Sequence, residues 1–260
     1  MASVIANQIT DTWAITKRNL LRYIRLPRLI FFSAIQPIIF LTLFNFVFGG
    51  ALGRSGAAIH GKYINYLLPG IIVQMTMFGG LQTGIGLATD MSSGLISRLK
   101  SLPMSRAAVL AGRTFADALR NLMVIGIMII YGYILGFRFF QGALDAFFMV
   151  LAILLFGYCL SWVTAFTGMK SKDPETAQLA TFVFIFPLVF ASSAFVPVAT
   201  MPGWLQAFAN NQPISFAVEV ARHFSNGAPL DGALWKLALW IAGLLAVFVP
   251  LSVYTYRNRT

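Results

Sequence analysis

Arg113, Asp117 and Arg120 are the charged residues whose spacing most directly allows them to act together. They stand at i, i+4 and i+7, so an α-helix would place all three on one face. On that face the Asp117 carboxylate can form an ion pair with either guanidinium. Charges beside an apolar segment are costly unless they are paired or near lipid headgroups. Two interpretations therefore stay open: anchors at a membrane boundary, or structural ion pairs at the cytoplasmic mouth of a membrane protein.

Residue patterns for catalysis, cofactor binding and metal binding are missing from the sequence. It has no G-x-x-x-x-G-K-[ST] loop, so any ATP hydrolysis requires another polypeptide. SRLK at 97–100 matches S-x-x-K but lacks the companion motifs of that enzyme class. The single cysteine, Cys159, excludes an internal disulfide and a cysteine metal cluster. We therefore predict a transport protein with no catalytic, cofactor-binding or metal-binding residues.

The elements that must position the charges are long apolar stretches. The chain is 58% hydrophobic, its mean hydropathy is +0.77 and 10% of its residues are charged, against roughly 25% in soluble domains. About 20 apolar residues in a helix cross the hydrocarbon core. Stretches without Lys, Arg, Asp or Glu cover 29–53, 63–89, 121–137, 146–169, 176–218 and 237–256. We predict an all-α polytopic membrane protein with spans at about 29–50, 64–89, 112–137, 144–169, 176–197 and 235–256.

The distribution of basic residues predicts the orientation. If the six predicted spans cross in turn, 14 of the 19 Lys and Arg residues fall on the side of the two termini. The positive-inside rule places that side in the cytoplasm. We expect a multi-pass protein of the cell membrane. The net charge of +11 does not indicate nucleic acid, because the basic residues flank apolar spans and form no stripe with interleaved aromatics.

The longest uncharged stretch, 176–218, holds more than one span requires. Its second half contains Pro202, Asn210, Asn211 and Pro213, which favour broken helices and turns. A second full crossing would also place the basic C-terminal tail outside. We therefore expect a short re-entrant element at about 199–218, on the outer face between the fifth and sixth spans.

Residues 1–28 form a separate predicted unit, and 29–260 form one transmembrane domain. Within 5–25, apolar residues including Trp13 and Tyr23 share one helical arc opposite a basic arc, as in an interfacial amphipathic helix. Pro27 then breaks the helix. This helix is either a simple anchor and orientation signal or also a contact for a cytoplasmic partner.

The connection between the second and third spans predicts a coupling helix at about 91–104. Leu99 and Leu102 belong to a short apolar stripe, Pro103 ends it, and Ser105 can cap the helix that follows. A compact helix held between two spans has the geometry to transmit a push from a soluble partner. An ordinary amphipathic loop is the alternative.

The predicted spans carry no deep charge, so an ion-coupled carrier would lack an obvious ion site. A path lined by Phe and Met with a few amides suits bulky, amphiphilic or lipid-like cargo, although such residues in membrane helices more often serve plain packing. The candidates for cargo contact are Gln36, Phe40, Phe44, Gln74, Met77, Phe182, Phe186 and Phe190.

Four segments give the chain a family resemblance. They are LLPGIIVQ at 67–74, RLKSLPMSRAAVLAGRTFADALR at 98–120, KDPETAQ at 172–178 and PLVFASSAFVPVATMPGWLQAFANNQPISFAVEVARHFSNG at 187–227. Together they resemble ABC type-2 permeases, the membrane subunits of daunorubicin-resistance-type exporters. The resemblance implies six membrane helices, a homodimer or heterodimer of permeases, and two copies of a separate ATPase that binds ATP and magnesium. It also implies outer re-entrant helices, and a dimer interface and cargo path on the first, second and fifth spans.

The resemblance also implies which residues contact the ATPase. Carried over by position, they are Arg98, Leu99, Lys100, Leu102 and Pro103, with Arg18 and Arg22 on the N-terminal helix. The expected function is the permease subunit of an ATP-driven exporter that moves hydrophobic drugs or lipids out of the cytoplasm or inner leaflet. A polysaccharide or teichoic-acid exporter is the alternative. An ion-coupled carrier and a membrane-embedded lipid enzyme are disfavoured.

Overall fold

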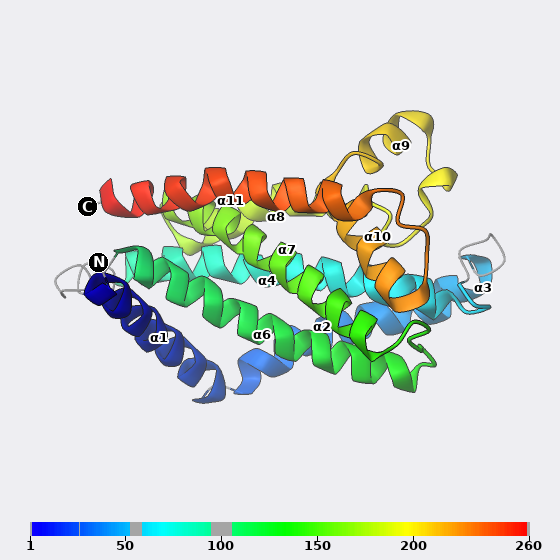
Figure 1. The fold of residues 1–260 in the computed structure, drawn as a ribbon, viewed down its shortest axis with the longest axis horizontal. Coiled ribbons are helices and arrows are strands. Elements are labelled where there is room, and N and C mark those ends of the chain that lie inside the picture. The colour runs from blue at the N-terminus through cyan, green and yellow to red at the C-terminus, as the bar shows by residue number, and fades with distance from the viewer. Residues whose placement is uncertain (1, 26, 53–58, 95–105, 259–260) are drawn as a thin grey trace.

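The computed structural model describes residues 2–25, 27–52, 59–94 and 106–258, and within these ranges the chain is helical, without a β-strand. Figure 1 shows the long helices side by side along the longest axis of the molecule. The first helix, α1 (Ala2–Arg25), and the end of the last, α11 (Ala233–Asn258), lie at one end of the bundle. The predicted all-α class is confirmed.

The other elements are α2 (Pro27–Leu43), a π-helical turn (Phe44–Phe48), α3 (Gly49–Leu52), α4 (Tyr63–Ser92), α6 (Arg106–Ile134), α7 (Ala143–Lys170), α8 (Pro174–Phe190), a 3-10 turn (Val198–Thr200), α9 (Gly203–Ala209) and α10 (Pro213–Asn226). Of the described helices, α4, α6, α7 and α11 are long and apolar enough to cross a membrane. Two shorter apolar helices lie at Ile35–Phe48 and Pro174–Phe190. The chain is therefore a polytopic membrane protein.

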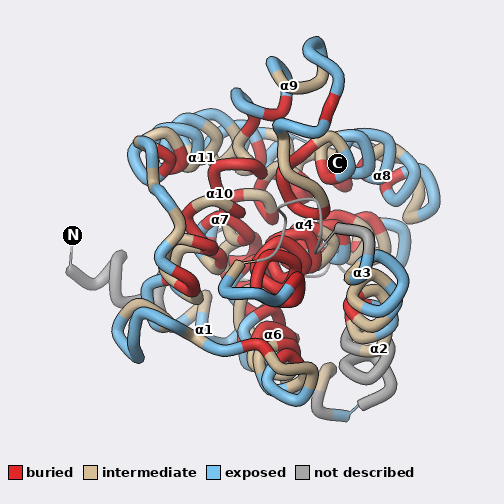
Figure 2. The backbone as a smooth tube through the Cα atoms, turned by 90° about the vertical axis from the view of Figure 1, so that its right-hand side faces the viewer, coloured by how far each residue is buried: buried red, intermediate tan, exposed pale blue. Residues whose placement is uncertain are grey.

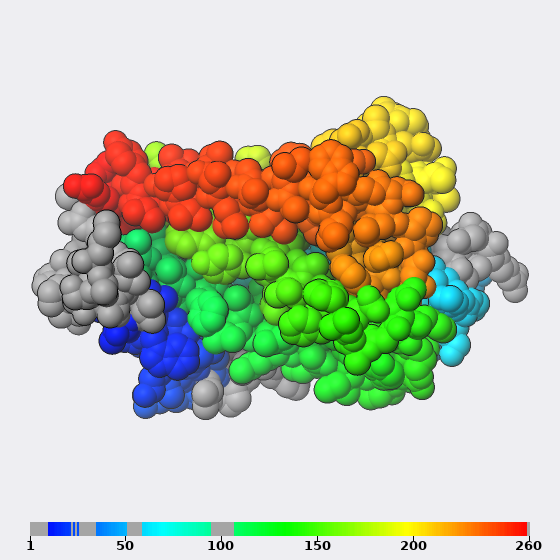
Figure 3. All heavy atoms as spheres, in the orientation of Figure 1, coloured from blue at the N-terminus to red at the C-terminus, as the bar shows by residue number. Residues whose placement is uncertain are grey.

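α4 is the central helix of the bundle. In its most apolar part 89% of residues are buried, against 11% in α11. Figure 2 shows α4 surrounded by other helices, and Figure 3 shows α11 along the surface of the molecule. α4 packs closely on α7 because Gly84 has no side chain: a Cβ there would lie 2.5 Å from the Thr164 carbonyl oxygen. The Thr164 hydroxyl also donates to the Gly80 carbonyl at 2.6 Å, so this G-x-x-x-G pair serves helix packing within the chain.

Proline and glycine set the helix boundaries. Pro27 and Pro174 occupy the first positions of α2 and α8, where a missing N–H costs nothing. Asp173 caps α8 by accepting the Thr176 backbone N–H at 2.7 Å, and its bonds to Thr176 hold the pKa of Asp173 below its ordinary value. α10 ends at Gly227, whose φ of 73° suits a left-handed cap.

The segment after α8 departs from the predicted boundaries. The span expected at 176–197 is helical only to Phe190, after which Tyr66 and Tyr63 hold the chain by donating to the carbonyls of Ser193 and Phe195. The re-entrant segment expected at 199–218 contains α9 and most of α10, but α10 continues to Asn226 because it packs against α4, α7 and α11. Most of the coupling helix expected at 91–104 lies outside the described residues.

Candidate functional site

α1 lies against the start of α6. The Thr16 hydroxyl donates to the Gly112 carbonyl at 3.0 Å, and Ile15 is buried beside the same glycine. Trp13 faces away from this contact and is exposed, as a residue at a membrane interface would be. The face of α1 that carries Ile15 and Thr16 therefore packs on α6, whereas Trp13, from the predicted apolar arc, lies on the exposed face.

Asp117 is the centre of a buried polar cluster where α1, α4 and α6 meet. Its side chain is 1% exposed. Its carboxylate accepts hydrogen bonds from the Tyr23 hydroxyl of α1 and the Thr83 hydroxyl of α4, both at 2.6 Å. Arg120 lies 3.7 Å away and completes the charge balance. Burial, with the nearby Asp117 carboxylate, raises the pKa of Tyr23 to about 12, so at neutral pH this hydroxyl remains a donor.

The two arginines beside Asp117 have different partners. Arg113 forms an ion pair with Asp90 at the end of α4, whereas Arg120 also donates to the Gly79 carbonyl at 2.7 Å. All four charged residues are buried, so the cluster joins α4 and α6 within the protein. The spacing of 113, 117 and 120 indicated their shared face, but Asp90 was missed because it lies on another helix.

The predicted ATPase contacts are only partly visible. Arg98, Leu99, Lys100, Leu102 and Pro103 lie outside the described residues. Arg22 lies within α1, although its side chain is not described. Arg18 is half-buried, and its guanidinium donates to the Asn19 side chain at 3.5 Å.

A continuous row of phenylalanine rings follows one side of the molecule and includes five of the eight predicted path residues. Consecutive rings in this phenylalanine row have centroids 4.4 to 6.3 Å apart. In order, the row consists of Phe40, Phe44, Phe195, Phe190, Phe186, Phe182 and Phe78. It therefore connects α2, the loop after α8, α8 itself and α4.

The row is open along α8. Phe182, Phe186 and Phe190 are 41%, 43% and 41% exposed, and their i, i+4, i+8 spacing aligns them on one helix face. Gln36 is exposed one turn before Phe40. By contrast, Gln74 and Met77 are each 1% exposed, so the structure places these two path candidates in the core and away from the open surface.

α10 lies at the end of the bundle opposite to α1 (Figure 1). Its Arg222 joins neighbouring segments there. This arginine is buried, and its guanidinium lies 3.4 Å from the centroid of the Tyr66 ring. Its Nε donates to the Tyr66 carbonyl at 3.0 Å, and its Nη2 donates to the carbonyls of Ser193 and Ala194 at 2.8 and 3.1 Å. One side chain thus fastens α10 to α4 and to the loop after α8.

Pro69 explains why this end of α4 needs hydrogen-bond donors from another helix. Pro69 has no N–H to give to the carbonyl of Asn65, which would otherwise remain unpaired inside the protein. Asn226 of α10 donates to that carbonyl at 2.7 Å, next to the bond from Arg222 to Tyr66. Among the described residues Arg222 has no ion pair, and burial lowers its pKa.

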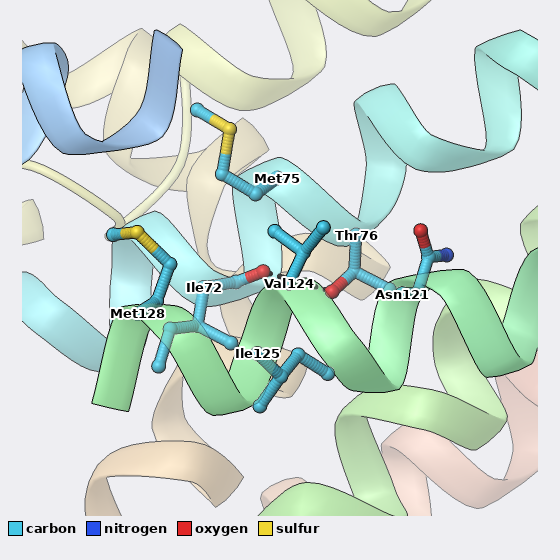
Figure 4. Close-up of a pocket in the computed structure, with 7 residues that line it drawn as sticks. All are labelled: Ile72, Met75, Thr76, Asn121, Val124, Ile125 and Met128. Atoms are coloured by element: carbon cyan, nitrogen blue, oxygen red, sulfur yellow. Dashed lines mark hydrogen bonds between the residues drawn. The ribbon is translucent and has the colours of Figure 1, made fainter. Parts of the chain in front are cut away.

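A small cavity between α4 and α6 has room for about one water molecule. Its volume is about 10 Å³, close to the minimum that a buried water requires. Figure 4 shows its lining: Ile72, Met75, Thr76, Asn121, Val124, Ile125 and Met128. This cavity is too small for cargo, whereas the phenylalanine row is open along α8.

The fold defines a polytopic helical membrane protein, and comparison with known proteins assigns the chain to a family within that class. Residues 10–224 match the model of the family described as ABC-2 type transporter. The chain is 32% identical to the daunorubicin resistance ABC transporter permease protein DrrB1 of Streptomyces coeruleorubidus, over 99% of this chain and 88% of that protein. It is 29% identical to the doxorubicin resistance ABC transporter permease protein DrrB of Mycobacterium tuberculosis, over 72% of this chain and 66% of that protein. The chain belongs to the ABC-2 type transporter family.

Family membership confirms the resemblance stated from the sequence. The chain is a multi-pass permease subunit of the cell membrane and is not an enzyme. It works with an ABC ATPase, which is a separate subunit.

Proposed function

We propose that this permease exports hydrophobic or amphiphilic drugs or lipids from the cytoplasm or inner leaflet, and that cargo moves along the phenylalanine row. The exposed faces of Phe182, Phe186 and Phe190 carry the proposal, since they offer an apolar, aromatic surface on α8. Aromatic faces bind flat or apolar molecules without directional bonds. The relatives named for daunorubicin and doxorubicin resistance support the same class of cargo.

A polysaccharide exporter is the alternative. Sugar chains need hydrogen-bonding groups along their path, and phenylalanine rings supply none. The composition of the row therefore favours hydrophobic or amphiphilic cargo.

We further propose that two permeases, identical or related, assemble with two ATPase subunits. Along α8 the phenylalanine row lies on the surface of one chain, and a second permease that packed against α8 would enclose it. ATP and magnesium would bind to the ATPase, which would contact residues 98–103 together with Arg18 and Arg22 of α1.

The proposed topology has six crossings, with both termini in the cytoplasm. The unbroken helical stretch from Pro27 to Leu52 and helix α8 add two crossings to the four long apolar helices. The position of α1 and the end of α11 at one end of the bundle suits an even number of crossings, and the basic residues favour the cytoplasm for that end (Figure 1). α9 and α10 would then form the re-entrant element of the outer face.

Substitution along α8 tests the proposal. Phe186→Ala removes a ring from the middle of the row, and should lower daunorubicin efflux about tenfold, equivalent to about 1.4 kcal/mol of lost stacking and apolar contact. Efflux is measured by fluorescence in cells that express the permease with its ATPase. Phe184→Ala is the matched control, because Phe184 is 66% exposed on the same helix but outside the row.

Equal efflux by the two variants would remove the row from the cargo path. Efflux that persists when the ATP-binding lysine of the ATPase is replaced would contradict ATP-driven export. If the permease exported a labelled polysaccharide but left daunorubicin efflux unchanged, the alternative cargo would be favoured.

A further inference from the structure

An open groove lies between the ends of α7 and α11, on helices that do not carry the phenylalanine row. Its volume is about 340 Å³. The lining residues are Met169, Lys170, Tyr254, Thr255 and Asn258. Among the described residues, the lining supplies one ammonium group, two hydroxyls and one amide, and no carboxylate. The groove is thus equipped to bind an anion.

Lys170 is the cation of this groove. Its Nζ lies 5.8 Å from the centroid of the Phe166 ring, and it forms no ion pair with any residue that the structure describes. The nearest acidic residue along the chain, Asp173, already accepts both the backbone N–H and the hydroxyl of Thr176. Lys172 adds a second exposed positive charge in the same connection.

An exposed apolar stripe on α11 leads to the groove. Val247, Leu251, Tyr254 and Asn258 are spaced i, i+4, i+7 and i+11, so they share one face of the helix. The first three are 55%, 36% and 65% exposed, and the last two of the four line the groove. Figure 3 shows α11 on the surface along much of the molecule. A ligand with an anionic head and an apolar tail would match both parts.

We propose that this groove binds the headgroup of an anionic phospholipid, with an acyl chain along the α11 stripe. Basic pockets at the ends of membrane helices suit such headgroups. Free phosphate would leave the stripe uncovered, and a cationic drug would be repelled by Lys170. The proposed orientation places the bound lipid in the inner leaflet.

Native mass spectrometry of the purified full-length permease tests this. The detergent-solubilised protein is given equal amounts of phosphatidylglycerol and phosphatidylcholine with identical acyl chains, and retained lipid is counted. We expect one phosphatidylglycerol per chain to be retained about fivefold better than phosphatidylcholine. Inorganic phosphate at millimolar concentration should not displace it. Equal retention of the two lipids, or displacement by inorganic phosphate, would overturn the proposal.

A pair of lysine variants locates the site. Lys170→Gln should lower phosphatidylglycerol retention about fivefold. Lys236→Gln is the matched control, since Lys236 also lies over a phenylalanine ring, with its Nζ 5.3 Å from the Phe216 centroid, but at the start of α11. Equal retention by the two variants would overturn the assignment. So would loss of the lipid when the ATPase is bound, because the ATPase would then occupy the groove.

Discussion

The Asp117 carboxylate is stabilised by hydroxyl groups from two other helices as well as by Arg120 on its own helix. A buried carboxylate that lost these partners would be strongly destabilising. Each hydroxyl therefore contributes more here than a typical exposed hydrogen bond would. The α1 partner, Tyr23, gives a direct way to measure this.

Tyr23→Phe should lower the free energy of unfolding by about 2 kcal/mol, since it removes one hydrogen bond to an ionised acceptor. Thermal unfolding in detergent micelles measures the change. Tyr158→Phe is the control: this tyrosine packs edge-on against Trp162, and its hydroxyl has no hydrogen bond within the described part of the chain. A similar loss in both variants would show that the hydrogen bond from Tyr23 to Asp117 adds no stability of its own.

The same hydroxyl predicts a dependence on alkaline pH. The pKa of Tyr23 is raised from 10.0 to about 12 in the folded protein, so its stabilisation is complete below the unfolded pKa and is lost as the pH rises through the folded one. The stability difference between the wild type and Tyr23→Phe should therefore narrow between about pH 10 and about pH 12. A difference that stays constant across this range would contradict the assigned proton.

At the scale of elements, close helix approach depends on glycines that face a neighbour. Gly112 of α6 is one of them: a Cβ there would lie 2.6 Å from the Thr12 carbonyl oxygen and 2.8 Å from the Ile15 Cβ of α1. Gly126, on the same helix, has nothing within 4 Å of the same position. The two glycines thus separate the effect of helix packing from that of helix propensity.

Gly112→Ala should displace α1 from α6 and cost about 1–3 kcal/mol through overpacking. Gly126→Ala should be neutral or stabilising by up to about 1 kcal/mol. The rate of tryptic cleavage in α1, which offers the exposed Lys17, reports the displacement. Cleavage at the wild-type rate in Gly112→Ala would mean that α1 does not depend on this contact.

The long apolar elements were predictable because their signal is local. The uncharged stretches predicted the bounds of α4, α7 and α11 to within a few residues, and Pro27 marked the start of α2. The end of α8 at Phe190 was not predictable, because the hydrogen bonds that hold the following loop come from Tyr63 and Tyr66 of α4. Nothing in the sequence of 176–197 indicates that these two tyrosines would bind it.

At the scale of the whole molecule, the basic connection between α4 and α6 leads to a prediction about assembly. Arg98→Glu combined with Lys100→Glu reverses two charges in the expected ATPase contact, and should lower co-purification of the ATPase about tenfold or more through like-charge repulsion. Membrane insertion should be unchanged. Lys62→Glu combined with Arg138→Glu is the control, since both residues are exposed at the end of the bundle opposite to this connection. Unchanged ATPase binding in the first variant would remove this connection from the interface.

The polar cluster around Asp117 was only half predictable, because some of its partners lie far apart in the sequence. The helical spacing of Arg113, Asp117 and Arg120 indicated their common face, but it could not reveal that Arg113 pairs with Asp90 of α4. The sequence patterns indicated no partner for Arg222. Its carbonyl partner Tyr66 lies 156 positions earlier in the chain, so only the assembled fold shows why this charge is buried.

Pro69 has a consequence for how the protein is made. The side chain that satisfies the Asn65 carbonyl belongs to Asn226, which is synthesised 161 residues later. α4 is therefore synthesised before the partner of its Asn65 carbonyl, and that carbonyl must be hydrated until α10 arrives. The central helix of the bundle is among the first to be inserted and among the last to be finished.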